Sequence, residues 1–243
     1  MKYEYNKKHE VSYSEVDKEM NVNLLNAARL AQDVTTDYFG AINSDNQTNK
    51  TKNNAVWVLI KTKVHFENYS KLGDFIEARC YTAHKKLATV DLEIDFKKGD
   101  NISFIVKQEC CPIDVTTRKI RGINTISYPN DMECIEPVLD KKYLRLNTKF
   151  EEIDKVYEQK VLASDIDFNN HVNNVKYIKY LMNAFSSDFW IEHEICDFEI
   201  HYINETREGE ILSIYQKTEE NEINFLIKNG DKEIARAKVE LKK

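Results

Sequence analysis

The chain repeats one pattern of elements twice, and any fold it adopts must accommodate that repeat. Residues 14–23 align with residues 164–173 at an offset of 150. The matching residues are Ser14 and Ser164, Val16 and Ile166, Asp17 and Asp167, Val22 and Val172, and Asn23 and Asn173. Further along, the spacing from His65 to Gly73 recurs from His201 to Gly209, now at an offset of 136. Similarity of this kind predicts two copies of one structural unit within the 243 residues.

The first copy is predicted to contain a strand, an amphipathic helix and four further strands. The strands are expected over residues 3–13, 55–67, 74–83, 88–96 and 102–115. The helix after residue 23 has a buried stripe at helical spacing, formed by Leu24, Ala27, Ala28, Ala31, Val34 and Tyr38. Its exposed face is predicted to carry Asn26, Arg29, Asp33 and Asp37. The polar stretch 43–54 that follows is predicted to be a loop.

The second copy repeats this plan, with a helix over 173–186 and strands over 156–163, 195–203, 210–218, 222–228 and 232–241. Asn229-Gly230, between the last two strands, is a strong hairpin signal. One long helix backed by an antiparallel sheet in each copy is an α+β arrangement in which the sheet wraps the helix, the hot-dog fold. We therefore predict two tandem hot-dog domains, at residues 1–125 and 151–243, with a surface linker over 126–150.

A polar cluster lies directly before the second helix. Asp167, Asn169 and His171 alternate along the chain, so an extended segment would point their side chains the same way. Backbone N–H groups and the helix dipole at such a position can stabilise an anion. The alternative hypothesis is plain helix capping, for which Asn169 or Asn170 would be suitable.

The repeat helps to choose between these two hypotheses. The first copy has Glu19 and Asn21 where the second copy has Asn169 and His171. A fold that forms in the first copy without an imidazole does not need one for capping. The difference therefore favours a chemical role for the polar cluster of the second copy.

Composition argues against several other classes of function. The net charge is −6 with no long run of one sign, which argues against generic nucleic-acid binding. With only 6 glycines and no C-x-x-C pair, we expect neither a phosphate-binding cofactor loop nor a metal site, and the five cysteines are expected to be reduced. The longest apolar run, 55–60, is far short of a membrane span. The first residues lack the apolar core of a signal peptide, so we expect a cytoplasmic protein.

The segment from Ser164 to Ile178 reads SDIDFNNHVNNVKYI. It resembles the acyl-[acyl carrier protein] thioesterases, tandem hot-dog enzymes of plants and bacteria, which show Asp-x-Asn-x-His-Val-Asn-Asn-Val-Lys-Tyr-Ile at this point. Weaker similarities lie at residues 57–59, 73–74 and 116–120. The resemblance extends over nearly the whole chain, loosely outside the start of the second helix.

The resemblance implies hydrolysis of the thioester between a fatty acyl chain and the phosphopantetheine of acyl carrier protein, a step of fatty acid biosynthesis. The family's catalytic groups fall on Asp167, Asn169 and His171, with a downstream acid at Glu205. The neighbouring cysteine of the family is Thr206 here, so we expect Glu205 and His171 to activate a water that attacks directly. The resemblance also implies that the first domain, whose own site is degenerate, shapes the acyl pocket.

Three alternatives stay open: an acyl-CoA thioesterase, another hot-dog enzyme such as a dehydratase, and a non-catalytic module that binds acyl groups or acyl carriers. Tyr69 stands in the first copy where Glu205 stands in the second, which favours a single catalytic copy. An acidic carrier would dock on basic residues, unless these are an ordinary solvated surface. The two candidate clusters are Arg118, Lys119 and Arg121, and Lys141, Lys142, Arg145 and Lys149. A homodimer is also left open by the sequence.

Overall fold

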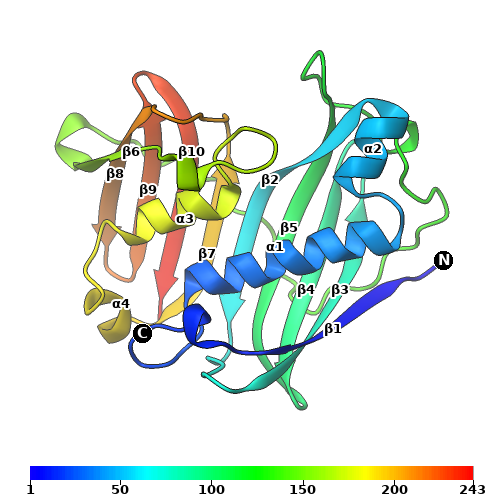
Figure 1. Ribbon diagram of the computed structural model, residues 1–243. Coiled ribbons are helices and arrows are strands. Elements are labelled where there is room, and N and C mark those ends of the chain that lie inside the picture. Colours follow the sequence, from blue (N-terminus) through cyan, green and yellow to red (C-terminus); the bar gives the residue numbers. More distant parts are fainter. Residues whose placement is uncertain (243) are drawn as a thin grey trace. The chain divides into compact units, whose positions relative to one another are not determined.

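The structure is a computed structural model that describes residues 1–242, and the chain divides into two compact units between Lys141 and Lys142. The first unit is built on an antiparallel sheet with the strand order β1-β3-β4-β5-β2. These strands are β1 (Glu4–Glu10), β2 (Ala55–Phe66), β3 (Phe75–Lys85), β4 (Val90–Lys98) and β5 (Asn101–Asp114). The helices are α1 (Leu24–Ala41) and α2 (Asn46–Asn53), with 3-10 turns η1 (Tyr13–Glu15) and η2 (Ile123–Thr125). Helix α1 contacts all five strands (Figure 1).

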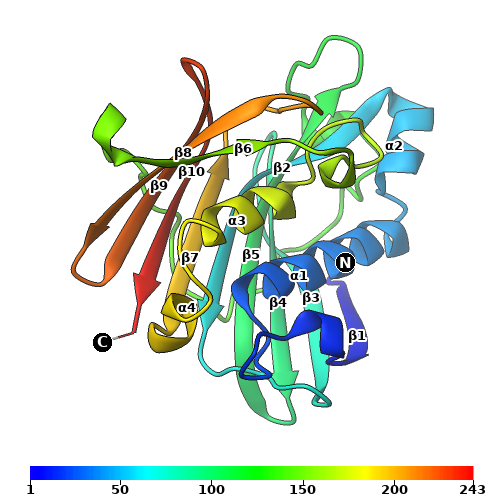
Figure 2. The ribbon, with the colours of Figure 1, turned by 60° about the vertical axis from the view of Figure 1, so that its left-hand side comes forward.

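The second unit has the same plan, with the strand order β7-β10-β9-β8-β6 and antiparallel neighbours throughout. These strands are β6 (Lys155–Lys160), β7 (Ile195–Tyr202), β8 (Ile211–Glu219), β9 (Glu222–Asn229) and β10 (Lys232–Leu241). The helices are α3 (Asn174–Met182) and α4 (Phe189–Glu192), and the 3-10 turns are η3 (Glu152–Asp154) and η4 (Ala163–Asp165). Helix α3 lies across the sheet of its own unit (Figure 2).

The strand predictions are confirmed in both units, each within a few residues of its observed bounds. The apolar stripe predicted for α1, from Leu24 to Tyr38, is buried as expected. The predicted exposure of Asn26 on the polar face of α1 is wrong, because this residue is buried. Its backbone N–H and its side chain both bond the Oδ1 of Asn23 at the helix N-terminus. The helical spacing of apolar residues therefore predicted the buried face of α1 correctly, and the exception is Asn26, whose side chain bonds the N-cap residue.

Two helix predictions are wrong. The stretch 43–54, predicted as a loop, contains α2, because Asp45 caps its first turn by accepting the backbone N–H of Thr48 at 2.9 Å. Helix α3 ends at Met182 rather than at residue 186, and Phe185 instead stacks on Phe189 of α4 with ring centroids 4.1 Å apart. Within residues 1–242, no helix combines the length and hydropathy needed to span a bilayer.

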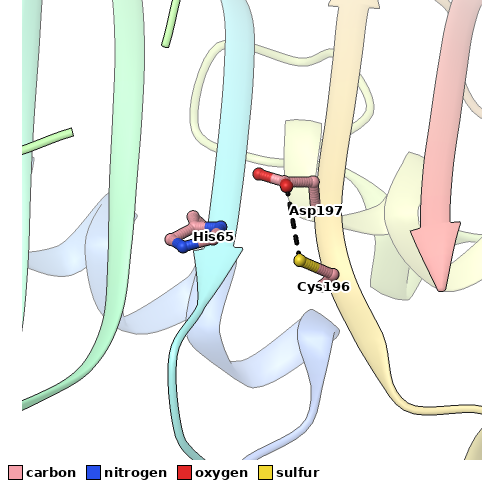
Figure 3. Close-up of side chains that lie close together, drawn as sticks. All are labelled: His65, Cys196 and Asp197. Carbon is pink, nitrogen blue, oxygen red and sulfur yellow. Dashed lines mark hydrogen bonds between the residues drawn. The ribbon is translucent and has the colours of Figure 1, made fainter. Parts of the chain in front are cut away.

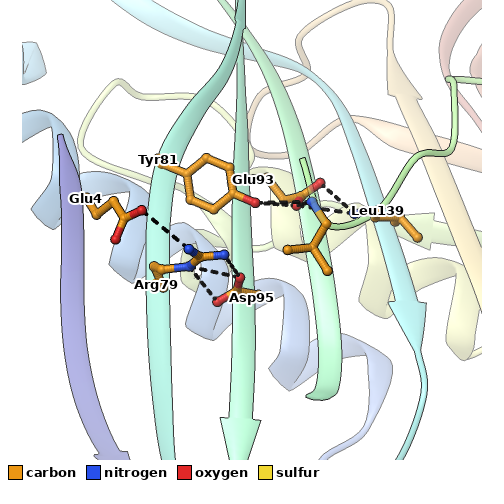
Figure 4. A network of polar contacts seen from close by, with 7 residues as sticks. Glu4, Arg79, Tyr81, Glu93, Asp95 and Leu139 are labelled. Atoms are coloured by element: carbon orange, nitrogen blue, oxygen red, sulfur yellow. Dashed lines mark hydrogen bonds and ion pairs between the residues drawn. The ribbon is translucent and has the colours of Figure 1, made fainter. Parts of the chain in front are cut away.

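Much of the segment predicted as a linker packs against the first unit. Its residues Tyr128, Met132 and Leu139 are buried. The fully buried Glu93 accepts hydrogen bonds from the Tyr81 hydroxyl (2.5 Å) and from backbone N–H groups of this segment, including that of Leu139 (Figure 4). Burial raises the pKa of the Glu93 carboxyl, although these donors oppose the shift. The segment up to Lys141 is therefore part of the first compact unit.

Candidate active site

The polar cluster forms a tight turn between η4 and α3. Ile166 and Val172 pair as an isolated antiparallel bridge at the base of the turn. Inside it, the Asp167 N–H donates to the His171 carbonyl (2.8 Å), and the Asn170 N–H donates to the Asp167 carbonyl (3.0 Å). Asn170 has a φ of 63°, the left-handed region that Asn tolerates better than most residues. The prediction of an extended segment with three parallel side chains is therefore wrong.

Asp167 holds this turn through its side chain. Its Oδ1 accepts the Asn169 N–H at 2.8 Å and lies 3.5 Å from the His171 N–H. The first copy contains the same arrangement, in which Asp17 Oδ1 accepts the N–H groups of residues 19 and 21 at 2.9 and 3.0 Å. An aspartate whose carboxylate bonds backbone N–H groups two and four residues on stabilises a turn in both copies. This observation gives Asp167 a structural task that does not depend on chemistry.

The capping hypothesis for Asn169 and Asn170 is wrong, because Asn173 is the N-cap of α3. The Asn173 Oδ1 accepts the Val175 N–H at 3.0 Å. The neighbouring backbone donors are also occupied, since Val172 N–H bonds the Thr206 carbonyl (3.0 Å) and Asn173 N–H bonds the Asp165 carbonyl (2.9 Å). An anion held by these helix N–H groups would have to displace protein acceptors. The site needs another donor for an anion.

His171 and Glu205 meet across the site. The His171 Nε2 and Glu205 Oε2 atoms are 3.1 Å apart, with 18% and 45% of the respective side chains exposed. Glu205 lies in the segment that follows β7, whereas His171 lies in the turn before α3. Asn169 is partly buried in the same turn, and within residues 1–242 its side-chain amide has no hydrogen-bond partner. The structure thus brings the side chains of His171 and Glu205 into direct contact, whereas the Asp167 carboxylate bonds the backbone of the turn.

Thr206 is not available as a nucleophile at this surface. It is fully buried, and its hydroxyl oxygen lies 2.7 Å from the Tyr177 hydroxyl of α3. Sequence reasoning did not single out Tyr177. A comparison of the two copies could have pointed to Tyr177, because the first copy has Ala27 at the same position.

A second residue missed by sequence reasoning is Asp165, which is buried below the turn. Its carboxylate accepts the Leu162 N–H at 3.0 Å and lies 3.6 Å from the Lys176 ammonium. Burial alone would raise the pKa of Asp165, but the Leu162 N–H, the Tyr180 hydroxyl and the nearby lysine ammonium groups together lower the pKa below its ordinary value. The first copy has Glu15 at this position, where it contacts His9 Nε2 at 2.7 Å. An acidic residue at the same position in both copies, 150 residues apart, could have identified Asp165 from the sequence.

The cysteines lie away from this site along the chain. Burial raises the pKa of Cys111 to about 11, so its thiol stays protonated at neutral pH. The Cys196 thiol donates to the Asp197 carboxylate on β7 with Sγ and Oδ2 3.5 Å apart (Figure 3). Nine residues of largely extended chain, about 30 Å at roughly 3.3 Å per residue, separate Cys196 from Glu205.

Comparison with known proteins gives a family. The acyl-ACP thioesterase N-terminal domain matches residues 2–125, and the acyl-ACP thioesterase C-terminal domain matches residues 148–243. The chain belongs to the acyl-ACP thioesterase family. Two solved structures share the fold over 98% of this chain: an acyl-ACP thioesterase from Bacteroides thetaiotaomicron (TM-score 0.89, 20% identity, 98% of that chain) and the 12:0-ACP thioesterase from Umbellularia californica (TM-score 0.82, 18% identity, 97% of that chain). The predicted α+β fold of two tandem hot-dog domains is confirmed.

The curated relatives are longer proteins, and the similarity covers only part of them. The chloroplastic dodecanoyl-[acyl-carrier-protein] hydrolase of Cinnamomum camphora is 24% identical over 174 residues, which are 67% of this chain and 44% of the relative. The palmitoyl-acyl carrier protein thioesterase of Cuphea hookeriana is 26% identical over 174 residues, 66% of this chain and 40% of the relative. The chain therefore spans less than half the length of the curated relatives it matches.

Proposed function

We propose that the protein hydrolyses the thioester between a fatty acyl chain and the phosphopantetheine of an acyl carrier protein, and so releases a free fatty acid. Membership of the acyl-ACP thioesterase family supports this activity, as do relatives whose names describe acyl-ACP hydrolysis. The observation that carries the proposal is the 3.1 Å contact between His171 Nε2 and Glu205 Oε2. The first copy has Asn21 and Tyr69 at these positions, so only the second copy offers an acid–base pair.

In the proposed mechanism, Glu205 is the general base. Its carboxylate is 45% exposed, so a water can approach it, while one of its oxygens is held by His171. The carboxylate takes a proton as the water oxygen attacks the thioester carbonyl carbon. A positioned base of this kind contributes about 10²–10⁴ in rate. His171 keeps the carboxylate in place, and after the products leave the Glu205 carboxyl releases its proton to solvent.

The attack forms a tetrahedral oxyanion, which needs a hydrogen-bond donor. The N–H groups of Val172, Asn173 and Val175 are occupied by protein acceptors, so the Asn169 amide is the proposed donor. Losing one such donor costs about 3 kcal/mol in the transition state. The intermediate then collapses, the carbon–sulfur bond breaks, and the thiolate leaves with little help, because a thiol with an ordinary pKa of about 8.5 is a good leaving group. Asp167 contributes by fixing the turn that carries Asn169 and His171.

The remaining expectations stay predictions. In the first basic cluster proposed for carrier docking, Arg118 and Lys119 are exposed, whereas the Arg121 guanidinium already bonds the Asn53 carbonyl and residue 125. The second cluster also has exposed side chains. Lys142, Arg145 and Lys149 are exposed. The part of the first unit in shaping the acyl pocket, the cytoplasmic location and a homodimer likewise stay predictions.

A side-by-side assay tests the proposal. Purified protein is given the same acyl chains on acyl carrier protein and on CoA, and released fatty acid is measured by mass spectrometry. We expect release from the carrier, with kcat/KM at least tenfold higher than from CoA. His171→Ala should lower this release at least a hundredfold. Preference for CoA would replace the substrate assignment, and binding of acyl carrier without any release would show a binding module instead of an enzyme.

A further inference from the structure

A buried pair of hydroxyl groups links the segment that carries Glu205 to the helix that follows His171. The Thr206 and Tyr177 hydroxyl oxygens are 2.7 Å apart. Thr206 is fully buried and Tyr177 is 3% exposed, so water does not compete for this bond. Neither side chain takes part in the mechanism proposed above.

A backbone bond reinforces the link at the same place. The Thr206 carbonyl accepts the Val172 N–H at 3.0 Å. Thr206 directly follows Glu205, and Val172 directly follows His171. The two segments are therefore tied together one residue away from each member of the acid–base pair, once through the backbone and once through side chains.

The first copy provides an internal comparison. There the Ser70 carbonyl accepts the Val22 N–H at 2.8 Å, so the backbone bond is present in both copies. The Ser70 hydroxyl, however, donates to Ser103 of β5 at 2.7 Å, and the helix position of the tyrosine is occupied by Ala27. In the copy that has Asn21 and Tyr69 in place of the imidazole and the carboxylate, the Ser70 hydroxyl therefore bonds the sheet and not the helix.

We propose that the Tyr177–Thr206 pair positions Glu205 for its contact with His171. This inference rests on the proposed function of the site. The Glu205 side chain is 45% exposed, and a contact to a side chain with that much exposure holds it in place only weakly, so the His171–Glu205 contact does not secure its own geometry. A buried hydrogen bond next to Glu205 fixes the backbone from which that side chain extends.

The pair acts as neutral hydroxyl groups. Burial raises the pKa of Tyr177 to about 12, so the phenol keeps its proton at any pH used for a thioester assay. Replacing Thr206 with valine keeps the shape and removes the hydroxyl, whereas replacing it with serine keeps the hydroxyl. Replacing Tyr177 with phenylalanine keeps the ring in its contact with Tyr202. These variants separate the hydrogen bond from the packing.

The experiment measures steady-state hydrolysis of an acyl-acyl carrier protein by the full chain. Thr206→Val and Tyr177→Phe should each lower kcat about tenfold with KM within about twofold of wild type, since small misplacements of catalytic groups cost rate more than affinity. Thr206→Ser, which keeps the hydroxyl, should have a kcat within about twofold of wild type. The matched control is Ser70→Ala, which removes the equivalent hydroxyl of the first copy and should leave kcat unchanged.

Crystal structures of wild type and Thr206→Val provide a readout that does not depend on turnover. We expect the 3.1 Å contact between His171 and Glu205 in wild type and its loss in the variant. An unchanged contact, or equal kcat in the valine and serine variants, would overturn the positioning role. A wild-type protein that hydrolyses no thioester would refute the proposed function alone, because the two crystal structures would still decide whether the pair positions Glu205.

Discussion

Replacing Glu205 with glutamine tests the acid–base pair with the smallest change of shape. Glutamine keeps an oxygen that can accept from His171 Nε2, but it cannot take a proton from water. The effect on the free energy of unfolding should be small, because 45% of the Glu205 side chain is exposed even though its contact with His171 is 3.1 Å long. Exposed ion pairs of this kind contribute about 0–1 kcal/mol to stability.

The effect on catalysis should be much larger. Loss of a general base costs about 10²–10⁴ in rate, or about 3–5 kcal/mol in the activation free energy. Fatty acid release from an acyl-acyl carrier protein is the assay, and urea denaturation of the same samples gives stability. His171→Ala combined with Glu205→Gln should be no more than about threefold worse than the slower single variant, because residues that act as a unit are not additive. A Glu205→Gln protein that keeps more than a tenth of wild-type kcat would refute the assignment of the base.

Three further predictions concern residues outside the acid–base pair. Glu19→Ala and Asn21→Ala should keep kcat within about twofold of wild type, and a hundredfold loss in either would disprove a single active site in the second copy. Alkylation of the native protein should modify the exposed Cys134 first and leave fatty acid release intact; inactivation by that one adduct would contradict a mechanism without a thiol. Asp165→Asn should lower the free energy of unfolding by about 2 kcal/mol at pH 7. The pKa of Asp165 in the folded protein is depressed, so the stability difference between wild type and variant should shrink as the pH falls through about 4 towards this depressed pKa. A stability difference that did not change down to about pH 2.5 would show that ionisation of Asp165 is not its source.

The strands were predictable because local signals agreed along the chain. Apolar runs alternating with polar residues marked them, and turn residues such as Gly99 and Gly230, both at positive φ, separated them. Helix α2 was missed because it has no apolar periodicity. Instead it is held by a cap at Asp45 and by the buried Asn49, whose side chain donates to the Ser44 carbonyl and accepts the N–H of residue 127.

The site was predictable in its residue types but not in its geometry. Alternating polar residues suggested a strand, whereas the Asp167 side chain bonds the backbone and closes a turn. The pairing of His171 with Glu205 followed from the family resemblance, since the two residues lie 34 positions apart and no periodicity links them. Tyr177 looked like one more residue of an amphipathic helix. Only the fold shows that its hydroxyl meets Thr206.

The most direct test of this account is a rapid-quench experiment with excess acyl-acyl carrier protein, in which free fatty acid and the intact mass of the enzyme are measured at each time point. A water activated by Glu205 predicts that fatty acid accumulates linearly from the first turnover, without a burst of thiol release, while the enzyme mass stays unmodified. An acylated enzyme that forms and decays at the catalytic rate, on Thr206 or on any cysteine, would contradict direct attack by water. The absence of fatty acid release at every time point would contradict hydrolysis itself.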